Sequence, residues 1–288
     1  MHFSLSSRSR STLAQLVGAK TFLLIILCIG IIPAWAEMSP PLRKPVVRIS
    51  KAERAVLLRL VAAYPDFLAR IKDGVLVWRD GTRMPVDDAI AGKTFKQQLE
   101  NPDILDMLSQ SYRVGPLTKP PKLNFDPGRI RVSRFFAKMY GDCRKGEVSR
   151  YLEDVVWLSA HKGRHLKVTT RNGVAAKLRA ISQELDALPD KFIAFLKPPG
   201  GTFNCRTIAG TTRLSTHSYG IAIDIAVKRS HYWRWSKQDP SGAIVYHNQI
   251  PMEIVAIFEK HGFIWGGKWF HYDTMHFEYR PEMISSQP

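Results

Sequence analysis

Apolar residues recur at helical spacing in three parts of the chain, and each part would turn one apolar face toward a core. The first helix follows Ser50, which forms the pattern of a capping box with Glu53. Asn172 can cap the second helix, and Gly262 stops the third. The predicted helices cover residues 51–64, 173–188 and 251–261.

Four other segments have the apolar patterns and flanking residues of strands. They are HLKVTT, GIAIDIAV, GFIWGG and TMHFEYR, at residues 165–170, 220–227, 262–267 and 274–280. A turn at Asp80-Gly81 predicts a short hairpin, and residues 87–112 are expected to be helical or irregular. Residues 115–129 and 197–201 are rich in proline and glycine and predict loops.

Helices and strands mix along the chain without regular alternation, which favours an α+β architecture. We predict an α+β domain over residues 146–288. Residues 37–145 are expected to form a smaller, mainly helical region, called the accessory region below. Residues 1–36 differ from both in composition.

The first 36 residues have the pattern of a signal peptide. They carry Arg8, Arg10 and Lys20 but no acidic residue, then the apolar run TFLLIILCIGII, then a small-x-small end at residues 34–36. This predicts export to the periplasm or cell envelope. The alternative is an uncleaved anchor helix, although a membrane span needs about 20 apolar residues and this run is shorter.

The net positive charge of the chain indicates which classes of partner to expect. The chain carries a formal charge of +17, and removal of residues 1–36 would leave +14. An exported basic protein is expected to meet anionic envelope polymers or a membrane surface, unless the charge only keeps the protein soluble. Basic residues are not interleaved with aromatic ones as in single-strand binders, so we expect no nucleic-acid partner.

Two cysteines, Cys143 and Cys205, remain after the predicted cleavage. In an oxidising compartment an even pair predicts one disulfide, and the alternative is two buried thiols. Cys205 as a zinc ligand competes with the disulfide and is not favoured. The disulfide would brace the stretch that begins at Arg206.

The segment STHSYGIAIDI contains His217 and Asp224, seven positions apart. In one straight strand their side chains would be separated by about 20 Å and would face opposite sides. A turn at Gly220, which tolerates positive φ, could bring the imidazole back beside the carboxylate. The strand face of Asp224 is otherwise lined by alanines, which leaves room for a ligand. By itself the pair is also compatible with a polar pair in the core.

A second cluster of polar residues favours a metal site over a polar pair in the core. His276 and Glu278 share one face of the last predicted strand, and Asp273 lies three residues before His276. Two imidazoles and one carboxylate leave the fourth position of a tetrahedral zinc open to water, as in catalytic sites. Zinc would lower the pKa of that water, and Asp273 could accept its proton.

These residues resemble the zinc D-alanyl-D-alanine carboxypeptidase family. The combined pattern is Ser215-x-His217-x-x-Gly220-x-Ala222-x-Asp224, followed by Asp273-x-x-His276. The family includes vancomycin-resistance D,D-dipeptidases, D,D-carboxypeptidases and the L-alanyl-D-glutamate endopeptidases of phage endolysins. The resemblance covers roughly residues 165–282 and implies a hedgehog/DD-peptidase fold that cleaves peptidoglycan stem peptides. Residues 37–140 have no counterpart in it.

The resemblance also implies roles for individual residues. It makes Asp273 the general base and implies one zinc ion per chain. Arg206 matches an arginine that holds the substrate carbonyl or carboxylate, and Arg213 is a competing candidate. The three implied zinc ligands are His217, Asp224 and His276.

Other polar and aromatic residues lie near this pattern in the sequence. Ser215 is expected to serve as a turn or supporting hydroxyl near the substrate. Trp265 and Trp269 could wall the substrate cleft or pack against Phe270. Glu278 is expected to orient His276 or to form a salt bridge.

The sequence therefore predicts an exported, monomeric zinc peptidase that removes a terminal D-alanine from peptidoglycan peptides. One alternative is an L-alanyl-D-glutamate-type endopeptidase. The other is a zinc-stabilised module that binds the cell wall without turnover, for which Asp273 would have no use.

Overall fold

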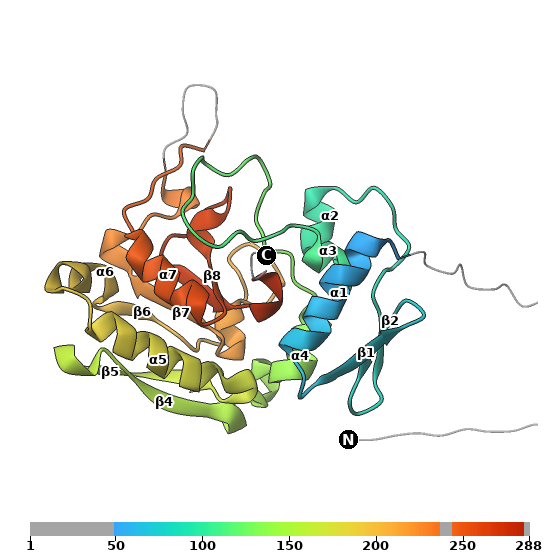
Figure 1. Ribbon diagram of the computed structural model, residues 1–288, viewed down its shortest axis with the longest axis horizontal. Helices are drawn as coiled ribbons and strands as arrows, with labels where there is room; N and C mark the ends of the chain where they lie inside the picture. Colours follow the sequence, from blue (N-terminus) through green and yellow to red (C-terminus); the bar gives the residue numbers. More distant parts are fainter. Residues whose placement is uncertain (1–48, 237–243, 285–288) are drawn as a thin grey trace, which may run out of the picture. The chain divides into compact units, whose positions relative to one another are not determined.

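The structure is a computed structural model that describes residues 49–236 and 244–284. The described residues belong to one compact unit, residues 44–288. They form helices and three antiparallel sheets (Figure 1), which confirms the α+β class. Among them, no helix is long and apolar enough to cross a membrane. The predicted signal peptide, residues 1–36, lies outside the described residues.

The sheet that carries the site has four antiparallel strands. In spatial order they are β6 (Pro199–Gly201), β7 (Ala222–Ala226), β9 (His276–Tyr279) and β8 (Phe263–Trp265). β7, β8 and β9 come from segments that the alternating pattern predicted. β6 was expected to be a loop. Its proline and glycine residues are not typical of a strand. The strand forms because it pairs with β7, which is a contact that the local sequence does not reveal.

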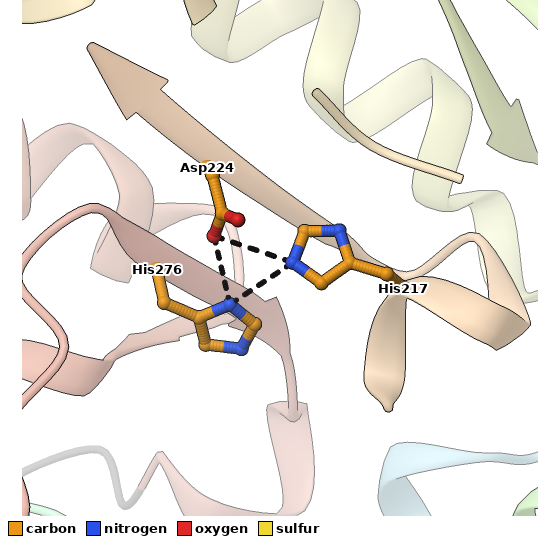
Figure 2. Close-up of side chains that lie close together, drawn as sticks. All are labelled: His217, Asp224 and His276. Atoms are coloured by element: carbon orange, nitrogen blue, oxygen red, sulfur yellow. Dashed lines mark hydrogen bonds and ion pairs between the residues drawn. The ribbon is translucent and has the colours of Figure 1, made fainter. Parts of the chain in front are cut away.

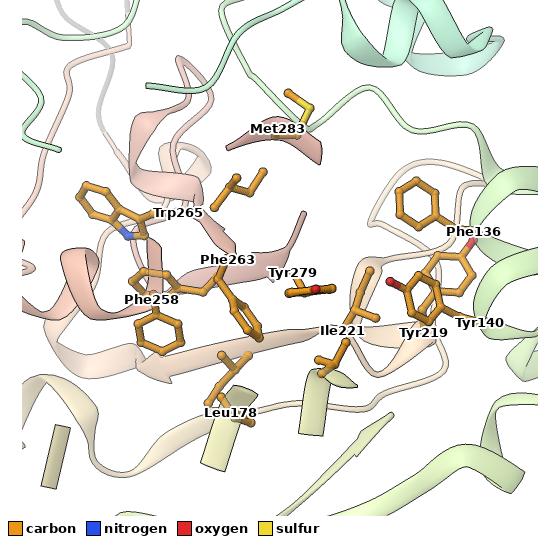
Figure 3. Packing of buried hydrophobic residues seen from close by; sticks show 14 of the residues in the cluster. Phe136, Tyr140, Leu178, Tyr219, Ile221, Phe258, Phe263, Trp265, Tyr279 and Met283 are labelled. Carbon is orange, nitrogen blue, oxygen red and sulfur yellow. The ribbon is translucent and has the colours of Figure 1, made fainter. Parts of the chain in front are cut away.

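Helices cover one face of this sheet. The long helix α5 (Val174–Asp186) lies between the β4–β5 hairpin and α7 (Met252–Lys260), as Figure 1 shows. In Figure 3, Leu178 of α5 and Phe258 of α7 lie beside Phe263 of the sheet, and Tyr279 lies on the other side of Phe263. The opposite face is therefore the one left for functional side chains. The remaining elements here are β4 (Leu152–Trp157), β5 (Arg164–Thr169) and α6 (Ile193–Leu196).

The start of α5 differs from the prediction. Gly173, and not Asn172, occupies the position before the helix, and no side chain caps it. Asn172 has φ of 55° and donates from its side chain to the hydroxyl of Tyr140 at 3.0 Å. A tertiary hydrogen bond thus replaces the local one that the sequence suggested. The capping box of Ser50 and Glu53, in contrast, is present at the first helix.

The accessory region contains more than helices. The turn at Asp80-Gly81 is present, but it belongs to a three-stranded sheet that the prediction of a mainly helical region missed. These strands are three to five residues long and expose charged side chains, so their alternation is weak. The elements are α1 (Lys51–Ala63), β1 (Leu68–Lys72), β2 (Val75–Trp78), β3 (Arg83–Pro85), α2 (Phe95–Glu100), α3 (Ile104–Leu108) and α4 (Ser133–Tyr140).

One hydrophobic core joins the accessory region to the rest of the described chain. Leu57 and Leu60 of α1 belong to the same buried cluster as Phe277 of β9. Figure 3 shows Phe136 of α4 beside Tyr219, and their ring centroids are 5.7 Å apart. The division into domains at residue 145 stays a prediction, because the core is continuous across it.

Candidate metal and peptidase site

Three ligand-type side chains meet on the open face of the four-stranded sheet (Figure 2). Asp224 and His276 are directly opposite each other on β7 and β9. Asp224 Oδ1 is 3.0 Å from His276 Nδ1 and 3.2 Å from His217 Nε2. His217 Nε2 and His276 Nδ1 are 3.2 Å apart. The predicted ligands therefore form a small, nearly equilateral triangle of donor atoms.

A turn at Gly220 brings His217 into this triangle. His217 lies in a short 3-10 helix, Thr216–Tyr219, and Gly220 follows it with φ of 69°. A Cβ at this position would lie 2.9 Å from Leu152 and 3.1 Å from the backbone nitrogen of Thr169. Glycine is thus required both for the positive φ and for the close approach. The turn predicted at Gly220 is present in the structure.

Hydrogen bonds fix the orientation of both imidazoles. His217 Nδ1 donates to the carbonyl of Thr202 at 2.5 Å, because a carbonyl can only accept. His276 Nε2 lies 3.1 Å from Glu278 Oε2 and donates to that carboxylate. The other nitrogen of each ring is then free to present a lone pair to the centre of the triangle. This is the arrangement in which metal-binding histidines are held.

The triangle fits a zinc ion. Ligands bonded to tetrahedral zinc at about 2.0–2.1 Å lie about 3.3–3.4 Å from one another. The three donor atoms here are 3.0–3.2 Å apart and are nitrogen and oxygen donors of the type that zinc accepts. Both histidines are almost fully buried, and Asp224 is partly exposed. The exposed side leaves a direction from which water or substrate can approach.

The pKa shifts of His276 and Asp224 indicate that a metal ion would replace a proton at this site. Burial disfavours charge on His276, but the carboxylates of Asp224 and Glu278 override it and raise the pKa of His276 to about 10. Against the effect of burial, the imidazoles hold the pKa of Asp224 well below its usual range. These shifts favour the protonated form of His276 when no cation is bound. Metal binding would release this proton.

Asp273 lies in the same cleft and is not part of the triangle. Its Oδ1 is buried and makes no hydrogen bond to any described residue. Burial and the negative charge of Asp224 raise the pKa of Asp273 to about 6. A buried carboxylate oxygen without a partner costs stability, which suggests that it serves a ligand.

The ligands line a cleft of about 270 Å³. Its walls include three arginines, Arg129, Arg131 and Arg206, and three aromatic side chains, Tyr232, Trp235 and Trp269. The positive side chains surround the two carboxylates of the site. Such a cleft is suited to a peptide that carries carboxylates.

Comparison with known protein families bears on this geometry. Residues 209–279 match the profile of a family described as D-alanyl-D-alanine carboxypeptidase. Over these residues the match confirms the resemblance to this family that the sequence indicated. It includes all three candidate ligands and Asp273, and it supports a peptidase. Searches of curated proteins and of solved structures found no match.

Four other candidate residues from the sequence differ in their position relative to the cleft. Ser215 and Trp269 line the cleft. Arg206 lines it as well and is exposed, whereas Arg213 lines a separate hollow. These positions favour Arg206 over Arg213 for contact with substrate.

Trp265 does not line the cleft, which corrects its prediction as a substrate-binding residue, one of the two roles that the sequence left open. It is fully buried, donates from its indole nitrogen to the carbonyl of Thr274 at 2.9 Å, and stacks near Phe277. The strand β8 turns this side chain into the core. Trp269, four residues later, lies beyond the strand and faces His276 with ring centroids 5.6 Å apart.

Cys143 and Cys205 form a disulfide in the structure, with Cα atoms 5.7 Å apart. It joins the end of the accessory region to the residue that precedes Arg206. The backbone of Arg206 is also held by Ser218, whose hydroxyl accepts from its nitrogen at 3.0 Å. Its guanidinium, in contrast, is exposed, and its Nη1 donates only a long hydrogen bond of 3.5 Å to the carbonyl of Thr207.

A buried chain of charges leads from the metal site to the accessory region. Glu278, fully buried, bonds His276 on one side and Arg131 at 3.1 Å on the other. Glu278 also accepts from Arg280 at 3.1 Å. Positive Arg131 and Arg280 keep the pKa of Glu278 low although burial opposes this. Glu278 thus orients His276 and forms salt bridges, the two roles that the sequence left open.

The chain continues to α1. Arg280 Nε donates to Glu282 at 2.5 Å, and Glu282 accepts from the hydroxyl of Tyr64 at 2.6 Å. Sequence reasoning missed Arg129, Arg131 and Tyr64 as contributors to the site. Arg129 and Arg131 lie in or next to a loop without a recognisable motif, so only the fold reveals them.

Proposed function

We propose that the protein is an exported zinc metallopeptidase that hydrolyses peptidoglycan stem peptides as a D-alanyl-D-alanine carboxypeptidase. The family match supports a peptidase, and the triangle of His217, Asp224 and His276 supports zinc. Export follows from the sequence of residues 1–36. We further propose a hedgehog/DD-peptidase fold, a monomeric state and contact with anionic envelope polymers.

The observation that carries an enzymatic function is the state of Asp273. Its Oδ1 is buried without a partner, and its pKa is raised to about 6. A general base works best when its pKa is near the operating pH. A module that only binds the cell wall gains nothing from this costly carboxylate.

The residues of the cleft suit peptide hydrolysis. His217, Asp224 and His276 would hold zinc, which when bound supplies a Lewis acid for a water molecule and the peptide carbonyl. Asp273 accepts the proton of the attacking water and passes it to the leaving amine. Thr202 and Glu278 keep the imidazoles in place during the reaction.

Arg206 favours a carboxypeptidase over an endopeptidase. Its guanidinium is exposed in the cleft and makes no hydrogen bond to a carboxylate among the described residues. Arginine binds carboxylates through two parallel hydrogen bonds, so it suits the free end of a peptide. An endopeptidase would place a neutral amide there.

Mass spectrometry of peptidoglycan fragments after incubation with the zinc-loaded protein tests the proposal. We expect loss of one terminal D-alanine from pentapeptide stems. Cleavage between L-alanine and D-glutamate would instead establish the endopeptidase. If intact fragments remain bound but uncleaved, the binding module is the correct function. The Asp273→Asn protein is the matched control for contaminating peptidases.

A further inference from the structure

Arg129 is brought to the cleft by a loop outside the family match. Residues 125–129 are fastened to residues 269–271, immediately before Asp273. Trp269 Nε1 donates to the carbonyl of Pro127 at 2.7 Å, and the backbone nitrogen of Phe270 donates to the carbonyl of Phe125 at 2.9 Å. These bonds make the loop a fixed wall of the site.

Two further features hold this loop in place. Asp126 is fully buried, and its carboxylate bonds both the backbone nitrogen and the imidazole of His271, at 2.9 and 2.6 Å. Gly128 has φ of 90°, and a Cβ there would lie 2.3 Å from Ile264. The backbone next to Arg129 is therefore held in a fixed position by these contacts.

The guanidinium of Arg129 is positioned but its charge is not neutralised. Nη1 donates to the carbonyl of His271 at 2.9 Å, and the group lies over the ring of Trp269 at 5.5 Å. Its nearest carboxylate, on Asp126, is 3.9 Å away and is already engaged by His271. Nη2 makes no hydrogen bond to the described residues and is not enclosed.

The other two arginines of the cleft differ from Arg129. Arg131 is buried and bonds Glu278, so it is committed to supporting His276. Arg206 is exposed and unpaired, and its proposed partner is the terminal carboxylate. Arg129 and Asp273 line the same cleft, so Arg129 lies near the reacting groups. One uncommitted guanidinium thus remains unexplained.

We propose that Arg129 is a specificity-determining residue that binds a second carboxylate of the substrate. This inference rests on the proposed function, since it assumes that a peptide lies in the cleft with Arg206 at its free end. The favoured substrates are then peptides with an acidic group on a residue near the scissile bond. The accessory region would select them, because it contributes Arg129.

An alternative role for Arg129 is to act only on the charge of Asp273. Binding measured in an Asp273→Asn background separates the two roles, because asparagine has no charge to adjust. The probe is a synthetic stem pentapeptide with isoglutamate, diaminopimelate and D-alanyl-D-alanine. Two further peptides have the isoglutamate or the side-chain diaminopimelate carboxylate converted to a carboxamide.

Titration calorimetry of the zinc-loaded Asp273→Asn protein would measure the affinity for each peptide. We expect one of the two amidations to weaken binding by about 10- to 100-fold, the usual loss for a charged hydrogen-bond partner. Addition of Arg129→Gln should abolish this preference. Addition of Arg134→Gln, an exposed arginine outside the cleft with the same change of charge, should preserve it.

Three results would overturn the inference. They are equal affinity for all three peptides, a preference that survives Arg129→Gln, and a preference that only Arg206→Gln removes. Zinc content and thermal unfolding check that each variant is intact. If Arg129→Gln does not fold, Arg129→Lys replaces it, and an intermediate preference is expected because lysine keeps the charge but not the fork.

Cleavage by the unsubstituted protein separates this inference from the proposed function. A protein that cleaves stem peptides without any Arg129-dependent preference keeps its function and refutes the inference. A protein that does not cleave them but shows the preference refutes the function and keeps the carboxylate site.

Discussion

The family-matched segment and the accessory region contribute to the site in different ways. Residues 209–279 supply the three candidate ligands and Asp273, which could do the chemistry. The accessory region supplies Arg131, Arg129 and Tyr64, which hold or surround those groups. The first set is recognisable from spacing, whereas the second depends on contacts between residues more than 140 positions apart. The ligands and Asp273 can thus be recognised from short sequence motifs. The residues that hold them in place can be recognised only from contacts between distant parts of the chain.

The largest effect is expected from loss of a ligand in the matched segment. His276→Ala should reduce zinc from about one ion per chain to almost none, because two remaining protein ligands hold zinc weakly. Elemental analysis after dialysis measures this, with circular dichroism to show that the fold survives. Stoichiometric zinc in a folded His276→Ala protein would mean that the ion lies elsewhere.

Asp273→Asn tests the other reactive group of that segment. It should lower turnover by about 10²- to 10⁴-fold while zinc content stays unchanged, because only the proton acceptor is lost. In the unsubstituted protein, turnover should fall as the pH drops, because Asp273 with a pKa of about 6 becomes protonated. Bound zinc would shift this limb to lower pH. An unchanged rate in Asp273→Asn would remove Asp273 from the mechanism.

Glu278→Gln sharpens the comparison, because Glu278 connects the two regions. It leaves Arg131 buried without its carboxylate and should cost about 3–5 kcal/mol of stability. It should also weaken zinc binding by about 10- to 100-fold, since His276 loses its orienting acceptor. Chemical unfolding and competition with a zinc chelator measure the two effects.

Glu259 offers a matched control for Glu278. It is also buried and bonds Lys268 and Tyr112, but it does not contact a ligand. Glu259→Gln should therefore lower stability without a change in zinc affinity. If both variants weaken zinc equally, Glu278 has no special role in orienting His276.

The disulfide is a covalent connection between the same two regions. Replacement of Cys143 and Cys205 by alanine should cost roughly 3–4 kcal/mol, as expected for closure of a loop of about 60 residues. Thiol titration of the denatured, unreduced mature chain should detect almost no free cysteine. Two free thiols in protein isolated from the envelope would contradict the bridge.

The smallest effect is expected at the far end of the buried charge chain. Tyr64→Phe removes one hydroxyl that donates to Glu282 and should cost about 1–3 kcal/mol, with zinc affinity unchanged. Thermal unfolding and chelator competition test both parts. A marked loss of zinc would show that α1 controls the metal site over this distance, and the division of roles would need revision.

The sequence predicted the reactive part of the site well because that part depends on local patterns. The alternation assigned Asp224 to the alanine-lined face of its strand and His276 to the face that Glu278 shares, and the structure pairs the two residues. The turn at Gly220 explained how His217 joins them. Strand pairing was not predictable in the same way. β6 and the accessory sheet have few apolar positions, so their existence depends on partners elsewhere in the chain.

Local sequence patterns also could not predict which side chains near the motif line the cleft. Trp265 and Trp269 look alike in the sequence and both are buried, yet only Trp269 also lines the cleft. The difference is set by where β8 ends. Arg129 and Arg131 had no spacing relationship to the motif, and only the docking of residues 125–131 places them in the site.

The buried charge chain has a consequence for the order in which the protein is made. Synthesis runs from the amino end, so α1 and Arg131 exist before β9 has been added. Until Glu278 and Glu282 arrive, Arg131 and Tyr64 lack the partners that permit their burial. The accessory region is therefore expected to remain incompletely packed until β9, the strand that carries His276, has been synthesised. Closure of the core and completion of the candidate metal site are therefore expected to coincide at the end of folding.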